Sequence, residues 1–220
     1  MTRTLRIMRV SYPDIQIPPW QGRRLRGFFG AAQENSLLHN HQPDGSMVYR
    51  YPLIQYKILR GVPTIVAIEE GISAVYPLVM ERETLLLGER EYPRGSLKFD
   101  LRKETVGDCS DLKHYRFLSP WFALNQENYR SYHSTDRKGQ EELLNRIILG
   151  NILSLAKGLN VTVEGKLEPH AVLRSGTVFF KGETMLVFRG SFTVNYNLPD
   201  LVGIGKSISR GFGVLQQEYA

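Results

Sequence analysis

The sequence contains a single cysteine, Cys109, among its 220 residues. One cysteine excludes both an intramolecular disulfide and a zinc site built from several cysteines. No stretch approaches the roughly 18 consecutive apolar residues of a membrane-spanning helix, and the start, MTRTLRIMRV, has no apolar run of the kind found in signal peptides. We therefore expect a cytoplasmic protein that does not bind a membrane.

Acidic residues are also fewer than basic ones. The 28 lysines and arginines outnumber the 22 aspartates and glutamates, which gives a net charge of +6 and a pI near 9.4. This balance favours an anionic partner, and a nucleic acid is the simplest one. With 42% hydrophobic and 23% charged residues, the chain has the composition of a folded protein with a sizeable core.

The order of apolar segments predicts an α+β fold. In the first part, strands are expected at residues 4–10, 47–59, 64–70 and 84–91, and helices near 20–35 and 72–80. This is the β-α-β-β-α-β order of a ferredoxin-like unit. No low-complexity linker marks a boundary, and we place it near residue 95, so that residues 1–95 form the first domain.

Residues 96–220 repeat this order loosely and form the expected second domain. Strands are predicted within residues 113–124, 161–165, 171–181 and 185–196, and a long helix at about 135–157. Ser134, Thr135 and Asp136 are possible N-caps, and Gly158 is a helix stop. A glycine-rich segment stands where a second helix would be expected. We predict two tandem ferredoxin-like (RRM-like) units.

That segment, VGIGKSISRGFGV, combines glycines, whose backbone is not covered by a side chain, with positively charged residues. Two cations lie between four glycines: Gly203, Gly205, Lys206, Arg210, Gly211 and Gly213. Exposed backbone N–H groups and cations suit a phosphate chain. The spacing matches neither a P-loop nor a dinucleotide fingerprint. The alternative is a glycine-rich hairpin that only packs.

The stretch LLHNHQPDG places two histidines, His39 and His41, one residue apart before a turn. Imidazole has a reference pKa of about 6.5, so one ring can accept a proton while the other donates one. A metal site would need a third ligand, and nothing marks Glu34 or Asp44 as that ligand. A pair of solvent-facing loop histidines is the third interpretation.

Other positions near the histidines could contact an RNA. Lys57 could stabilise the charge that develops on a reacting phosphate, or be an ordinary exposed strand lysine. Tyr51 could stack on a base or belong to the core. Phosphate contacts or a solvated helix face would each explain the cluster of Arg23, Arg24 and Arg26.

Two blocks of the sequence resemble a known family. GIGKSISRGFGVL resembles the C-terminal glycine-rich loop of the repeat-associated RNA-binding superfamily of CRISPR systems. RRLRGFFG, the H-N-H pair, YRYPLIQYKILRG and IVAIEEG together resemble one branch of its repeat-RNA-processing endoribonucleases. The two blocks lie in different halves of the chain, and the glycine loop also occurs in members that do not cleave RNA.

The resemblance implies two ferredoxin-like folds that bind CRISPR repeat RNA and cleave it without a metal ion or another cofactor. A ribose 2′-OH attacks the adjacent phosphate, and the histidine pair of that branch maps onto His39 and His41. Other CRISPR effector subunits and a second copy of the chain are partners that the resemblance leaves open. Two further readings stay open: a guide-RNA-binding subunit that does not cleave, and a metal-dependent hydrolase built on the H-x-H pair.

Overall fold

The computed structural model describes residues 1–31, 37 and 51–219. The chain forms two compact units. The N-terminal unit contains residues 4–104 together with 208–211, and the C-terminal unit contains residues 105–207 together with 1–3 and 212–220. The short return of residues 208–211 matters for the site, because it brings part of the glycine-rich segment into the N-terminal unit.

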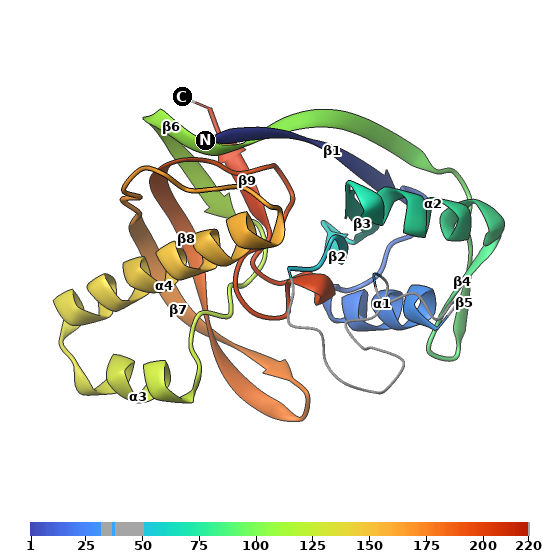
Figure 1. Cartoon of the computed structure of the whole chain (residues 1–220). Helices are drawn as coiled ribbons and strands as arrows, with labels where there is room; N and C mark the ends of the chain where they lie inside the picture. The colour runs from blue at the N-terminus through green and yellow to red at the C-terminus, as the bar shows by residue number, and fades with distance from the viewer. Residues whose placement is uncertain (32–36, 38–50, 220) are drawn as a thin grey trace, which may run out of the picture. The chain divides into compact units, whose positions relative to one another are not determined.

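The N-terminal unit follows the predicted β-α-β-β-α-β order. Its elements are β1 (Thr2–Ser11), η1 (Pro19–Gln21), α1 (Gly22–Gly30), β2 (Ile54–Leu59), β3 (Val62–Ile68), α2 (Glu70–Glu81), β4 (Thr84–Leu87) and β5 (Arg90–Pro93) (Figure 1). The single strand predicted at residues 84–91 is wrong. Gly88 has a φ of +76°, and this left-handed backbone turns the chain into a separate two-stranded hairpin, β4–β5.

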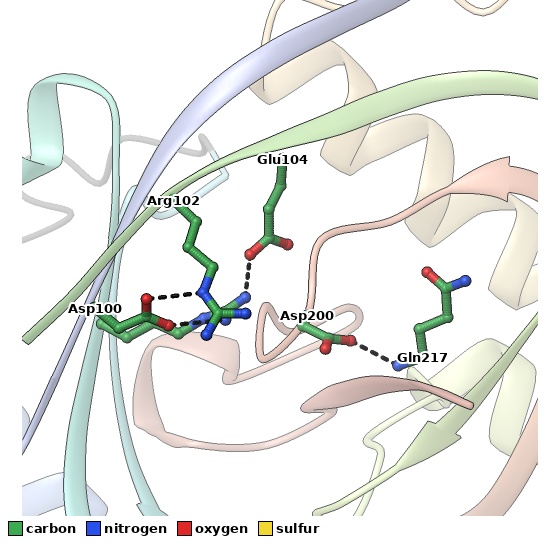
Figure 2. A network of polar contacts seen from close by, with 6 residues as sticks. Asp100, Arg102, Glu104, Asp200 and Gln217 are labelled. Atoms are coloured by element: carbon green, nitrogen blue, oxygen red, sulfur yellow. Dashed lines mark hydrogen bonds and ion pairs between the residues drawn. The ribbon is translucent and has the colours of Figure 1, made fainter. Parts of the chain in front are cut away.

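The sheet of this unit has β2 at its edge, followed by β3 and β1, all antiparallel. The edge position agrees with the proline that precedes β2, at position 52. Next to β1 comes β6 (Lys98–Phe117), whose first part takes the place expected for the fourth strand. Arg9 on β1 ion-pairs with Glu104 and, over 3.4 Å, with Asp100, which also accepts from Arg102 over 2.8 Å (Figure 2). The strand pairing here is thus supported by charge as well as by the backbone.

The core of the N-terminal unit lies between the sheet and its two helices. Leu25 and Phe29 of α1 and Val75 of α2 are completely buried in one cluster with the inward side chains of β1, β2 and β3. The ring of Phe29 stacks on Tyr56 of β2, with centroids 5.7 Å apart. Each such side chain contributes about 1.5–3 kcal/mol when it leaves water. This packing fixes α1 against β2, the two elements that carry most of the site.

The C-terminal unit contains the second part of β6, then α3 (Gln126–Ser134), α4 (Arg137–Gly158), β7 (His170–Phe180), β8 (Glu183–Asn197) and β9 (Leu215–Glu218). In its sheet β8 lies between β7 and β6, and β9 pairs with the other edge of β6. The glycine-rich segment stands in place of a second long helix, as the sequence predicted, and its residues 208–210 form the short helix η2 (Ile208–Arg210), which belongs to the N-terminal unit. The α+β class with two ferredoxin-like units is confirmed.

Helix α4 agrees closely with the prediction. The carboxylate of Asp136 accepts a hydrogen bond from the N–H of Gly139 over 2.9 Å, which makes Asp136 the N-cap. The helix lies across one face of the sheet (Figure 1) and buries an apolar stripe that includes Ile148, Ile152 and Leu155. Two expectations around it were wrong: the strand predicted over residues 113–124 ends at Phe117, and residues 161–165 form no strand. Helix α3 is an element that the sequence analysis did not predict.

Candidate RNA-binding site

The two histidines His39 and His41 lie outside the described residues. The structure describes the chain on either side of them, where α1 ends at Gly30 and β2 begins at Ile54. The assignment of acid–base chemistry to this pair therefore stays a prediction. What the structure does give is the set of cations on α1, β2 and η2 within the N-terminal unit.

Lys57 is completely buried on β2. Its Nζ donates a hydrogen bond to Oε1 of Gln55 over 2.8 Å, and no carboxylate of the described chain forms an ion pair with it. Burial disfavours the ammonium form and lowers the pKa of Lys57 to about 7. The reading of Lys57 as an exposed strand lysine is thus wrong, and its amine can gain or lose a proton near neutral pH.

Gln55 connects Lys57 to Tyr51. Its Nε2 donates to the hydroxyl of Tyr51 over 2.9 Å and to the carbonyl of Pro52 over 3.1 Å. Tyr51 is only 7% exposed, and burial raises the pKa of its phenol well above the usual value. Its ring therefore belongs to the core and does not offer a surface for base stacking. The three side chains form a buried polar chain that runs from the residues before β2 into the strand.

Three arginines gather beside this strand, from α1 and η2. Burial lowers the pKa of Arg210, and the like charges of Arg26 and Arg23 lower it further. Burial also lowers the pKa of Arg26. Within the described part of the chain, no carboxylate lies within ion-pair distance of Arg23 or Arg26. Three cations whose like charges lie close enough to lower the pKa of one of them form a site that an anion would stabilise.

The backbone places these elements in direct contact. A Cβ at Gly22, the first residue of α1, would lie 2.9 Å from the carbonyl oxygen of Arg210. A Cβ at Gly211 would lie 3.3 Å from the Cα of Lys57, and Gly211 has a φ of +91°. Only glycine allows both close approaches, so Gly22 and Gly211 bring Arg210 against α1 and β2.

The remaining glycines of the segment serve packing in the C-terminal unit. Gly205 has a φ of +93°, and a Cβ there would lie 2.5 Å from the indole Nε1 of Trp121. Gly213 has a φ of +62° and abuts the carbonyl of Ile204, while Gly203 pairs with Val214 in an isolated bridge. These contacts match the packing interpretation of the glycine pattern. The ammonium of Lys206 donates to the carbonyl of Leu124 over 2.9 Å, and partial burial lowers its pKa.

Arg24 does not join the other two arginines of α1. Its guanidinium lies over the ring of Trp20, with Cζ 5.0 Å from the centroid, and its NH1 is 3.5 Å from Oε1 of Gln21. The arginine cluster predicted from the sequence is therefore divided. Arg23 and Arg26 approach η2, and Arg24 covers an aromatic ring.

Across residues 1–31, 37 and 51–219, no three histidine, cysteine, aspartate or glutamate side chains gather as a metal site would require. Over the same ranges, no helix has the length and apolar character needed to cross a membrane.

Two family models together match nearly the whole chain. The model of the Cas6b N-terminal domain matches residues 3–105, and that of the Cas6b C-terminal domain matches residues 108–218. The chain belongs to the Cas6b family. This Cas6b chain is therefore a CRISPR protein of the Cas6 type, in agreement with the resemblance seen in its sequence.

Individual relatives agree with this assignment. A solved structure described as Cas6b is 34% identical, with a TM-score of 0.94 over 98% of this chain and 100% of that one. A second, described as the CRISPR RNA processing endoribonuclease Cas6b, is 32% identical, with a TM-score of 0.81 over the same shares. An uncharacterised protein of Methanocaldococcus jannaschii is 43% identical over 111 residues, which is 50% of this chain and 76% of that protein.

Sequence reasoning missed two residues that shape the site of this Cas6b chain. Gln55 is one of them, although the alternation of strand side chains already predicts that positions 55 and 57 share a face. Trp20 is the other. Its exposure and its contact with Arg24 depend on the three-dimensional path of η1 and could not be read from spacing.

Proposed function

We propose that this Cas6b chain is a metal-independent endoribonuclease that cleaves CRISPR repeat RNA to release guide RNAs. The observation that supports this most directly is the gathering of Arg23, Arg26 and Arg210 beside the buried Lys57, on a chain of the Cas6b family. One relative is described as a CRISPR RNA processing endoribonuclease. Repeat RNA is an anion that such a set of cations can bind.

In the proposed reaction, the 2′-OH of one ribose attacks the phosphorus of the adjacent phosphate. The bond from phosphorus to the 5′-oxygen breaks, which leaves a 2′,3′-cyclic phosphate and a 5′-hydroxyl. A base removes the proton of the 2′-OH, and an acid protonates the leaving oxygen. We assign these two roles to His39 and His41, because imidazole can do either near neutral pH.

The cations of the site have a separate role in this proposal. Arg23, Arg26 and Arg210 hold the phosphates of the RNA and stabilise the negative charge that develops in the transition state. Burial lowers the pKa of Lys57 to about 7. A phosphate held by the three arginines favours the ammonium form of Lys57, which then adds a fourth positive charge to the site. Lys206 contacts the backbone of the RNA from the glycine-rich segment.

The test is cleavage of a labelled repeat RNA in excess EDTA. The intact protein is compared with His39→Ala/His41→Ala, and His170→Ala serves as the matched control because this histidine is exposed at the start of β7. A repeat with 2′-deoxyribose at the cut site is run alongside. We expect cleavage by the intact protein and the control, at least about 100-fold slower cleavage by the double variant, and an intact deoxy substrate.

Three other results would each contradict a part of the proposal. Loss of cleavage in EDTA would support a metal-dependent hydrolase. Equal cleavage by the double variant would remove the histidines from the mechanism. Tight binding of the repeat without any cleavage would identify the chain as a guide-RNA-binding subunit.

The proposal places the enzyme in the cytoplasm, with CRISPR repeat RNA as its first partner. Other CRISPR effector subunits and a second copy of the chain stay as predicted partners. The molar mass of the protein, measured in solution with and without repeat RNA, tests for the second copy.

A further inference from the structure

The most exposed aromatic side chain next to the arginine site is that of Trp20. It lies on η1, directly before α1, and 61% of its surface is exposed. The chain has only one other tryptophan, Trp121, which is completely buried. An exposed indole presents a flat apolar face on which another flat ring can stack.

The ring of Trp20 is held in place from one side. The Arg24 guanidinium lies over it, with Cζ 5.0 Å from the ring centroid. Arg24 in turn is 3.5 Å from Oε1 of Gln21, a residue that is 4% exposed. A Cβ at Gly88 would lie 2.9 Å from the Cζ of Arg24, so the glycine of the β4–β5 turn leaves room for this arginine.

Trp20 and two arginines of the site are also close along the chain, on η1 and the helix α1 that directly follows it. Arg23 and Arg26, which approach η2, follow Trp20 within two turns of the chain. An RNA whose phosphates lie on these arginines would have bases within reach of η1. An aromatic ring next to a row of cations is the usual arrangement for binding single-stranded nucleic acid.

We propose that Trp20, with Arg24 against one face, stacks with its other face on one unpaired base of the repeat RNA. This inference rests on the proposed function, because the arginines must hold the RNA backbone nearby. The ligand is a single-stranded nucleotide, and stacking accepts any base because every base has a π-face. Trp20 thereby fixes the position of the RNA along the site.

The test uses the tryptophan itself as the probe. Because Trp121 is buried, quenching of the intrinsic fluorescence by added repeat RNA reports on Trp20, while anisotropy of a labelled repeat measures affinity independently. We expect quenching in the intact protein and its loss in Trp20→Phe, which should keep an affinity within about threefold. Trp20→Ala should bind about five- to 100-fold more weakly, and Tyr76→Ala, another exposed aromatic, should bind normally.

A second experiment identifies the base. Repeats with one abasic nucleotide at successive unpaired positions are titrated against the intact protein and Trp20→Ala. One abasic position should weaken binding to the intact protein as much as Trp20→Ala does, and should cost nothing further in the variant. Two results would overturn the inference. One is binding of the repeat without quenching of the tryptophan fluorescence, and the other is a loss of affinity at every abasic position that adds in full to the loss caused by Trp20→Ala. Failure of the intact protein to bind the repeat would instead contradict the proposed function.

Discussion

The buried amine of Lys57 should make the stability of the protein depend on pH. Its pKa is about 7 in the folded chain, against 10.5 for an ordinary lysine. Between these values the unfolded chain binds the extra proton and the folded chain does not. The free energy of unfolding therefore rises as the pH increases from about 7 to 10.5, and below pH 7 the full penalty is present.

The size of this effect follows from the gap between the two pKa values. At about 1.4 kcal/mol for each pH unit, burial of the charge costs about 5 kcal/mol at most. Lys57→Met keeps the length and apolar stem of the side chain and removes the amine. Gln55 then loses a partner, which costs about 1–3 kcal/mol at every pH. The pH-dependent part, roughly 3–4 kcal/mol between pH 6 and pH 10, should disappear.

The assay is urea unfolding at pH 6, 7, 8, 9 and 10 for the intact protein, Lys57→Met and the control Lys103→Met, which replaces an exposed lysine of β6. All other titrating groups are common to the three proteins and cancel in the differences. The advantage of Lys57→Met over the intact protein should shrink steadily as the pH rises. If the two curves run parallel from pH 6 to pH 10, Lys57 is not a buried amine with a lowered pKa.

Three further predictions concern binding and stability. Arg26→Gln should lower the slope of log affinity against log salt by about 0.7 for repeat RNA, one phosphate contact of a single strand; an unchanged slope in a binding titration would remove Arg26 from the site. Gly205→Ala should destabilise the protein by about 2 kcal/mol or more, because residue 205 has a positive φ and lies against the Trp121 indole. Its control, Gly150→Ala, adds a methyl group to open space inside α4 and should stabilise the protein by about 0.5–1 kcal/mol. Thermal unfolding measures both, and equal shifts of Tm would contradict the prediction. Asp136→Ala should cost about 1 kcal/mol in the same assay through loss of the N-cap of α4, and no change would mean that the cap is not needed.

The parts of the fold that the sequence predicted are those with a strong local pattern. Helix α4 has an apolar stripe, a capping aspartate and a terminal glycine, and the β7–β8 hairpin has two apolar runs around Lys181 and Gly182. The first part of β6 was missed because most of its side chains are exposed and many are charged. Its strand form comes from pairing with β1 and from ion pairs such as Arg9–Glu104, which are long-range contacts. Helix α3 buries no residue, and its sequence QENYRSYHS has no aliphatic side chain that would mark a core face.

The candidate site was predicted in part. Residue type and spacing were enough to select Lys57, Arg23, Arg26 and Arg210 as cations worth testing. They could not predict that Lys57 is buried, because strand alternation gives a shared face and not its exposure. Nor could they predict that Arg24 turns away toward Trp20, since the turn of the β4–β5 hairpin that accommodates it lies more than sixty residues further along the chain.

The central claim is that one set of residues binds the repeat RNA and another cuts it. The most direct test measures the dissociation constant and the single-turnover cleavage rate together, for Arg26→Ala/Arg210→Ala and for His39→Ala/His41→Ala. We predict that the arginine variant binds at least about tenfold more weakly, whereas the histidine variant binds like the intact protein and cuts at least about 100-fold more slowly. Unchanged affinity in the arginine variant, together with unchanged cleavage in the histidine variant, would contradict the account.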